Sequence, residues 1–377
     1  MRDLIKYSKR IVIKLGTGLL TKDAGIIDEH IVRGLVNQMC SLMDEGREII
    51  LVSSGAIGAG FPFLDLTKRP TTLPLLQASA SVGQAKLMRL YDNLFGKANL
   101  TVAQLLLTRD DLKIRKRHLN IRNTINTLIQ RRVIPIINEN DTVSVDEIRF
   151  GDNDLLAALV TNLIQADLLI NLTNVDGLLK KSPDGKIMSG CVISQLKGVP
   201  LCASRETCGD KSKLGTGGMS AKLKAAKMIT TAGEFMVIAN GREKNILIRI
   251  LNGDEVGTLF TPAKGKMQTR KRWIAFFHQA KGKIIVDHGA QHAIIHKGKS
   301  LLPSGIQSYE GKFNVGDIVL IYNQNNEEIG KGLINFSHNE LNKIIGCHTS
   351  DIENILGYRS YDEVIHRNNL VITCCEH

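Results

Sequence analysis

Two carboxylates flank an amide in the segment Asp152-Asn153-Asp154, which directly precedes an apolar run typical of a helix. Neighbouring carboxylates often work as a general acid and a general base. Short polar side chains at a helix start also cap its free N–H groups, and an anion there is stabilised by the helix dipole. These residue types therefore leave two interpretations open, an acid–base pair or a helix start whose side chains face a ligand.

A glycine-rich stretch, LGTGGMSAK from Leu214 to Lys222, leads into a second run typical of a helix. Glycines let backbone N–H groups approach phosphate oxygens, and the following helix N-terminus adds partial positive charge. The stretch is not a Walker A loop, because GxxxxGK[ST] does not occur in the chain, and SSGAIGAG at 53–60 does not match the GxGxxG dinucleotide motif. It predicts a phosphate-binding loop that belongs to neither class.

Short apolar runs alternate with helical patterns through the first 240 residues. Residues 28–45 predict a helix, since apolar side chains recur at Ile31, Leu35, Met39 and Leu42 and Gly46 can end it. The alternation predicts a mostly parallel sheet with helices on both sides. The predicted strands, each expected to be buried on both faces, are 10–15, 48–53, 101–107, 133–138 and 168–173.

Polar or glycine-rich residues follow four of these strands. Open parallel sheets bind ligands beyond the carboxyl ends of their strands, so we expect these residues to line a ligand site on one edge. Each alone also fits a structural role, as a surface lysine, a helix cap or a turn residue, but their joint placement favours the site. They are Lys14 to Gly18, Ser53 to Ala56, Asn138 to Asp141 and Thr173 to Gly177.

The 377 residues predict two domains. We expect a catalytic domain at 1–262 and, at 263–280, a basic linker without helical periodicity in which Trp273 packs between the domains. From 281 to 377 short strands, including 283–287, 317–322 and 330–336, predict a small β-rich domain.

Composition indicates an ordinary soluble globular protein, with 43% hydrophobic and 23% charged residues. No run approaches the ~18 apolar residues of a membrane span, and the N-terminus MRDLIKYSKR lacks the apolar core of a secretory signal. We therefore expect a cytoplasmic protein that does not contact membranes. The seven cysteines form no CxxC pair, which favours reduced thiols over disulfides or a zinc site.

The net charge of +12 is uneven, since residues 263–377 carry 14 Lys and Arg against 11 Asp and Glu, and residues 1–262 carry the remaining +9. Such an excess suits small anionic substrates and also nucleic acid. The basic run Arg109–Arg122 has no aromatic residue to stack on bases, which favours a solvated helix face.

The chain carries the motifs IVIKLGTG, VSSGAIGAG, PIINENDTV, GDNDLLAAL, LTNVDGLL and GTGGMSAK, then VGTLF, RKRWIAF, VDHGA, LLPSGI, GDIV, ILGY and EVIHRNNLV. In this order the motifs resemble the glutamate 5-kinase family of the amino-acid kinase superfamily. NEND with GDND and a C-terminal PUA domain is specific within the superfamily, whereas KLGT and the TGGM loop are shared more widely. The resemblance implies a three-layer αβα sandwich with a mostly parallel central sheet, followed by a small β-rich PUA domain.

The resemblance implies ATP-dependent phosphorylation of the γ-carboxylate of L-glutamate to L-glutamyl 5-phosphate, the first step of proline biosynthesis, with Mg²⁺ as cofactor. It also implies a homo-oligomer that proline inhibits by feedback. Because acyl phosphates hydrolyse readily, glutamate-5-semialdehyde dehydrogenase is an expected physical partner.

Site residues follow from the resemblance by motif. Lys14, Asp154 and Lys222 would be catalytic. Ser54, Asp141 and Asn153 would hold glutamate. The implied ATP-binding residues are Lys14, Thr173, Asn174, Thr216, Gly217, Gly218, Met219, Ser220, Ala221 and Lys222.

The implied reaction gives different tasks to the residues of the segment Asp152-Asn153-Asp154. A glutamate side chain, with a pKa of about 4.3, is already ionised at neutral pH, so no general base is required. We expect Asn153 to contact glutamate and Asp154 to orient Lys14 and Lys222 by ion pairing. Asp152 would cap the helix or hold a loop.

Three residues depart from the family pattern on the expected nucleotide side. Gly18 replaces the usual serine, Asn174 an aspartate and Leu179 a tyrosine. Two other functions are alternatives, a superfamily kinase acting on carbamate, aspartate, N-acetylglutamate or uridylate, and a PUA-mediated RNA-binding protein. The NEND and GDND pair argues against the first, and the net charge of only +3 in residues 263–377 disfavours RNA.

Overall fold

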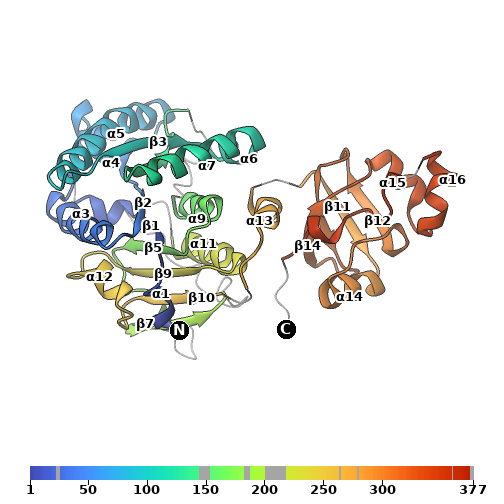
Figure 1. Ribbon diagram of the computed structural model, residues 1–377. Coiled ribbons are helices and arrows are strands. Elements are labelled where there is room, and N and C mark those ends of the chain that lie inside the picture. The colour runs from blue at the N-terminus through green and yellow to red at the C-terminus, as the bar shows by residue number, and fades with distance from the viewer. Residues whose placement is uncertain are drawn as a thin grey trace. The chain divides into compact units, whose positions relative to one another are not determined.

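The computed structural model describes most of the chain as two compact units, Met1–Lys266 and Met267–His377 (Figure 1). In the described residues no helix combines the length and apolar character needed to cross a membrane. The described residues are 1–22, 26–143, 153–181, 187–199, 218–262, 265–277, 280–358 and 360–373.

The first unit is built on an eight-stranded sheet with the order β3-β4-β2-β1-β5-β9-β10-β8. Its strand pairs are parallel except for β9 with β10. All five strands predicted for this unit are present. The bounds are β1 Arg10–Leu15, β2 Glu48–Val52, β3 Val102–Leu107, β4 Ile134–Glu139, β5 Leu168–Thr173, β8 Gln195–Lys197, β9 Phe235–Asn240 and β10 Thr258–Thr261.

The prediction that every one of these strands is buried on both faces is wrong for β3. This strand lies at the edge of the sheet and pairs only with β4. Gln104 in its middle is exposed. An apolar run reports that a segment is buried but not which strands flank it, so the edge position was not predictable from composition.

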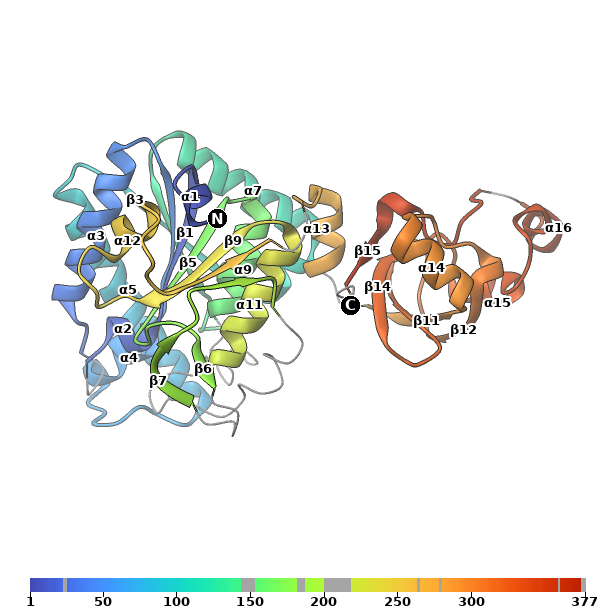
Figure 2. The same cartoon turned by 90° about the horizontal axis from the view of Figure 1, so that it is seen from below.

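Helices cover both faces of the sheet, as Figure 2 shows. The helices α3, α5 and α12 lie over one face, while α7, α9 and α11 lie over the other. The helix predicted at 28–45 is α3. The bounds are α3 Glu29–Asp44, α5 Leu73–Gly96, α7 Arg115–Gln130, α9 Asn153–Ile164, α11 Met219–Ala232 and α12 Ile246–Leu251.

Alternation along β1 decides which side chains reach which face. Ile11, Ile13 and Leu15 belong to the core beneath α3 and α5. Successive side chains of a strand point to opposite faces, so Val12 and Lys14 face α9 and α11. The arrangement places the buried Lys14 among helix starts on the opposite side of the sheet from that core.

The basic run Arg109–Arg122 forms α6 (Arg109–Lys113) and the start of α7. Arg115, Lys116 and Arg117 are exposed, whereas Ile125 and Ile129 of α7 are buried. The expected solvated face is therefore confirmed for these three cations.

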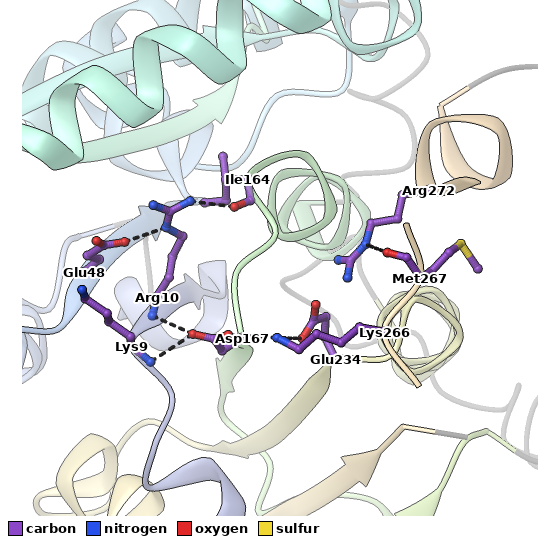
Figure 3. Close-up of polar contacts among 9 residues, drawn as sticks. All are labelled: Lys9, Arg10, Glu48, Ile164, Asp167, Glu234, Lys266, Met267 and Arg272. Carbon is purple, nitrogen blue, oxygen red and sulfur yellow. Dashed lines mark hydrogen bonds and ion pairs between the residues drawn. The ribbon is translucent and has the colours of Figure 1, made fainter. Parts of the chain in front are cut away.

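A polar network lies at the amino edge of the sheet, where the strands begin (Figure 3). The Asp167 carboxylate accepts hydrogen bonds of 3.0 Å from the backbone N–H groups of Lys9 and Arg10. The ammonium group of Lys266 lies 3.1 Å from Asp167 and 3.3 Å from the carboxylate of Glu234, which is 1% exposed. Burial raises the pKa of Asp167, but these donors outweigh it and hold the pKa below its usual value. The network joins the starts of β1, β5 and β9 to the last residue of the unit.

The second unit has its own five-stranded sheet, in the order β12-β11-β13-β14-β15. Its core is separate from that of the first unit. The three predicted strands are present, although the third runs from Glu328 to Leu333 rather than from 330 to 336. The bounds are β11 Gly282–Val286, β12 Ile306–Gly311, β13 Ile318–Tyr322, β14 Glu328–Leu333, β15 Leu370–Ile372, α14 His288–Lys297, α15 His338–Ile344 and α16 Ile352–Leu356.

Residues 269–276, in the segment expected to lack helical structure, form α13 (Thr269–Phe276). Ile274 and Ala275 of this helix pack with Ile318 and Val371 of the second unit, and Trp273 packs against the same cluster. Basic residues dominate this segment and its apolar face is short, so the sequence pattern did not predict the helix.

Two glycines allow α4 (Ala56–Gly60) and α5 to approach closely. A Cβ atom at Gly83 would overlap the carbonyl oxygen of Ala56, and one at Gly60 would overlap that of Ser79. Both obstacles are backbone atoms, so a side chain at either position would push the helices apart. The contact holds the chain that follows Ser54 against α5.

We predict that Gly83→Ala lowers the free energy of unfolding by about 2 kcal/mol or more, because backbone must move to admit the methyl group. The matched control is Gly96→Ala in the same helix, where nothing lies within 4 Å of the added atom. It should leave stability unchanged or raise it by up to ~1 kcal/mol. Urea unfolding of both variants measures the difference, and equal effects would contradict the close approach.

Candidate active site

Residues singled out from the sequence gather at the carboxyl edge of the central strands. Lys14 is next to last in β1, Ser54 follows β2, and Thr173 ends β5. The parallel strands β2, β1 and β5 are neighbours, so their carboxyl ends meet at one edge. The starts of α9 and α11 reach the same place through Asp154 and Lys222, whose side chains meet that of Lys14.

Asp154 lies between two lysines from different elements. Its carboxylate is 2.5 Å from the ammonium nitrogen of Lys14 on β1 and 2.9 Å from that of Lys222 on α11. The three side chains are 1%, 7% and 8% exposed, respectively. Asn171 on β5, in register with Lys14, donates a third bond of 2.9 Å to the carboxylate. The ion pairing expected from the sequence is therefore present.

The two lysines keep Asp154 ionised although it is buried. Burial by itself raises the pKa of Asp154, but the charges and hydrogen bonds of Lys14 and Lys222 lower it from 3.8 to about 2. Two ammonium groups and one carboxylate leave the cluster with a net positive charge. Such a charge, shielded from water, favours the binding of an anion such as a phosphate group.

Asn153, one residue earlier, faces a different set of partners. Its amide nitrogen lies 2.9 Å from the hydroxyl of Ser54, 3.2 Å from the side-chain oxygen of Asn138 and 3.3 Å from the carbonyl of Ser53. Its amide oxygen is buried and has no hydrogen-bond partner among the described residues. Buried polar atoms are normally paired, so this oxygen is available to a donor on a ligand.

Helix geometry explains why neighbours 153 and 154 point to different partners. Both belong to the first turn of α9, where successive side chains project about 100° apart around the axis. The rest of α9 is buried almost completely, from Leu156 to Ile164, so the helix cannot rotate without exposing its apolar surface. The packing of α9 thus sets the direction of both side chains.

Three side chains that support this site, Gln84, Tyr91 and Asn171, were not predicted from the sequence. Asn138 donates to the side chain of Gln84 at 2.8 Å, and Ser53 forms a hydrogen bond of 2.9 Å with Tyr91. Burial raises the pKa of Tyr91 to about 12. Asn171 offered a usable signal, a single amide in the otherwise apolar strand LLINLT, whereas Gln84 and Tyr91 lie in an ordinary helix and offered none.

Two of the departures from the family pattern are neighbours in space. A Cβ atom at Gly18 would lie 3.5 Å from the amide nitrogen of Asn174. Asn174 is exposed, and its side-chain oxygen accepts a hydrogen bond of 3.3 Å from Thr173. Leu179 begins the separate strand β6 (Leu179–Lys181).

The remaining predicted residues are placed only in part. Gly218 precedes α11, and Met219, Ser220 and Ala221 form its first turn, all half-buried. Asp141 is half-buried in the turn after β4. The predictions for Asp152, Thr216 and Gly217 lie outside the described residues.

We predict that Asp154 makes stability depend on pH between about 4 and 2. A carboxyl group with a pKa of 3.8 when unfolded and about 2 when folded binds more protons in the unfolded state over this range. Stability should therefore be complete above pH 4 and fall as the pH is lowered, by ~2 kcal/mol for this group.

The measurement is urea unfolding from pH 5 to pH 2.5 of the wild type and of Asp154→Asn. The wild type should lose more stability over that range than the variant, which has no carboxyl group there. Parallel pH profiles would show that the pairing does not lower this pKa.

Comparison with known proteins gives the chain a family. Residues 9–240 match the amino acid kinase family model, and residues 282–356 match the PUA domain model. Three named glutamate 5-kinases are similar over nearly their whole length. The one from Caldanaerobacter subterraneus is 48% identical over 96% of this chain and 97% of that protein. The one from Thermoanaerobacter pseudethanolicus is 47% identical over 96% of this chain and 97% of that protein.

The glutamate 5-kinase of Citrifermentans bemidjiense is 45% identical over 98% of this chain and 99% of that protein. These matches confirm the resemblance stated from the motifs, and with it the predicted αβα fold and C-terminal PUA domain. The chain belongs to the glutamate 5-kinase family.

Proposed function

We propose that the chain transfers the γ-phosphoryl group of ATP to the γ-carboxylate of L-glutamate, giving L-glutamyl 5-phosphate and ADP as the first step of proline biosynthesis. One observation carries this proposal beyond family membership. At the start of α9, Asp154 forms ion pairs with two lysines. Asn153, whose side chain points in another direction, donates a hydrogen bond to Ser54. This arrangement suits a site that must hold two anionic substrates next to each other.

The reaction needs little proton chemistry. The γ-carboxylate of glutamate is ionised at neutral pH, with a pKa near ~4.3, so one of its oxygens can attack phosphorus directly. The new O–P bond forms while the bond from phosphorus to the ADP oxygen breaks, and no proton is transferred. The task of the protein is to overcome repulsion between anions and to align them.

In this proposal Lys14 and Lys222 neutralise charge on the phosphoryl group, and Asp154 keeps both ammonium groups in position. Ser54 and Asn153 bind glutamate, and Asp141 accepts from its α-ammonium group. The N-terminus of α11, with its partial positive charge, suits phosphate oxygens. The proposed ATP-binding residues are Lys14, Thr173, Asn174, Thr216, Gly217, Gly218, Met219, Ser220, Ala221 and Lys222.

We propose that Mg²⁺ enters with the phosphates of ATP rather than in a protein cage. In the part of the chain that is described, no three His, Cys, Asp or Glu side chains gather around one point. The Asp154 carboxylate already accepts from Lys14, Lys222 and Asn171. Mg²⁺ commonly takes most of its ligands from substrate phosphates and water, and it supplies further charge neutralisation there.

Further proposals rest on what the family resemblance implies. They are feedback inhibition by proline, a homo-oligomer, a cytoplasmic location and association with glutamate-5-semialdehyde dehydrogenase. The proposed limits are residues 1–262 for the kinase domain, 263–280 for the linker and 281–377 for the PUA domain and tail. Neither another superfamily substrate nor RNA binding as the main activity is favoured by the named relatives.

We predict that ADP release depends on L-glutamate and ATP together. A coupled ADP assay with glutamate, aspartate, N-acetylglutamate, carbamate and uridylate as acceptors measures this. L-Glutamate should give the highest kcat/KM, and hydroxylamine should trap its acyl phosphate as a hydroxamate. Glutamate giving no more ADP than buffer would overturn the proposed function.

We predict opposite kinetic effects at the two neighbouring residues of α9. Asp154→Asn should lower kcat on the order of 10²-fold, because the lysines lose their charged partner, with a much smaller change in the KM for glutamate. Asn153→Ala should raise that KM by roughly 10-fold or more, because a hydrogen bond to a charged group is lost.

The control is Asp92→Asn, which changes an exposed carboxylate on α5 and should leave both parameters unchanged. The reverse pattern, with glutamate KM responding to Asp154 and kcat to Asn153, would show that the two roles are exchanged.

A further inference from the structure

Three histidines follow one another at every fourth position of α14, in the second unit. His288, His292 and His296 are all exposed. Residues four apart on a helix lie on the same face, one turn from each other. Ile294, between the last two, is buried in the core of the unit, so the helix rests on that side and presents the histidines to solvent.

The last two imidazole rings are already close together. The ring centroids of His292 and His296 are 4.9 Å apart, and the ring planes differ by 44°. A metal ion bound to one nitrogen of each ring, at about 2.0–2.1 Å, would place two adjacent ligand rings with centroids roughly 4.5–5.3 Å apart. The observed separation falls in this range, so the spacing of the two rings is compatible with a shared metal ion.

We propose that His292 and His296 form a two-ligand site for a borderline transition-metal ion such as Ni²⁺, Cu²⁺ or Zn²⁺. Imidazole nitrogen suits these ions, whereas Mg²⁺ prefers oxygen, so the site is distinct from any Mg²⁺ that accompanies ATP. Within the described residues no third His, Cys, Asp or Glu completes a cluster, so water fills the remaining positions.

Charge near the pair does not oppose the proposal. Lys297 follows His296 directly, but adjacent residues on a helix do not face each other. His288 lies one turn before His292 and is equally exposed, yet the close ring pair is between His292 and His296. His288 therefore provides a matched control of the same residue type on the same helix face.

The test is calorimetric titration of Ni²⁺ into the untagged full-length protein at pH 7.5. The chain has ten histidines and seven cysteines, so other groups also bind Ni²⁺ and the result is the difference between variants. The double variant His292→Gln/His296→Gln should lose one binding site or weaken it at least 10-fold. Glutamine is a good helix former and both positions are exposed, so α14 should persist.

The matched double variant is His288→Gln/His348→Gln, which removes two exposed histidines and leaves the pair intact. It should bind Ni²⁺ within about threefold of the wild type, because two ligands on one rigid element remain. Circular dichroism should show equal helix content in all three proteins.

A local measurement identifies the ligands themselves. With ¹³C-labelled histidine, substoichiometric Ni²⁺ should broaden the imidazole signals of His292 and His296 first. Equal Ni²⁺ binding in the wild type and in His292→Gln/His296→Gln would overturn the proposal. An equal loss in His288→Gln/His348→Gln would overturn the assignment to this pair. Both measurements are independent of kinase activity.

Discussion

The structure of the kinase unit depends on one buried carboxylate, Asp154, whose negative charge is compensated by two lysines. Burying an ionised Asp154 at 1% exposure without a partner would carry a large free-energy penalty, and so would burying either ammonium group alone. The compensation requires β1, β5, α9 and α11 to meet at one point, because Lys14, Asn171, Asp154 and Lys222 come one from each. The fold and the proposed phosphate site are thus coupled by the same three bonds.

The same two helices connect this point with the opposite edge of the sheet. α9 begins at Asn153 and ends shortly before Asp167, which binds the backbone at the start of β1. α11 begins beside the site and ends next to Glu234, which pairs with Lys266. Polar contacts at both ends and apolar packing between them restrict sliding and rotation of the helices. Such restriction is what a site needs when catalysis depends on holding charges in position.

The second unit differs from the kinase unit in where its candidate ligand residues lie. Its sheet and core are formed by its own residues, and none of the proposed catalytic side chains lies in it. The histidine pair on α14 occupies a solvent-exposed helix face, where side chains are not needed for the core. A ligand site can form there from the spacing of residues on one helix alone, without the converging strands that the kinase site requires.

The sequence by itself determined the five main strands of the first sheet and the family, and it predicted different tasks for Asn153 and Asp154. Periodicity and motif order are local properties, so they can be read along the chain. Only the tertiary structure decided that β3 is an edge strand, that Asn171 bonds to Asp154, that Gly18 lies beside Asn174 and that Gly60 and Gly83 let two helices touch. These contacts join residues far apart in sequence, and they depend on strand order and helix packing, which no local pattern encodes.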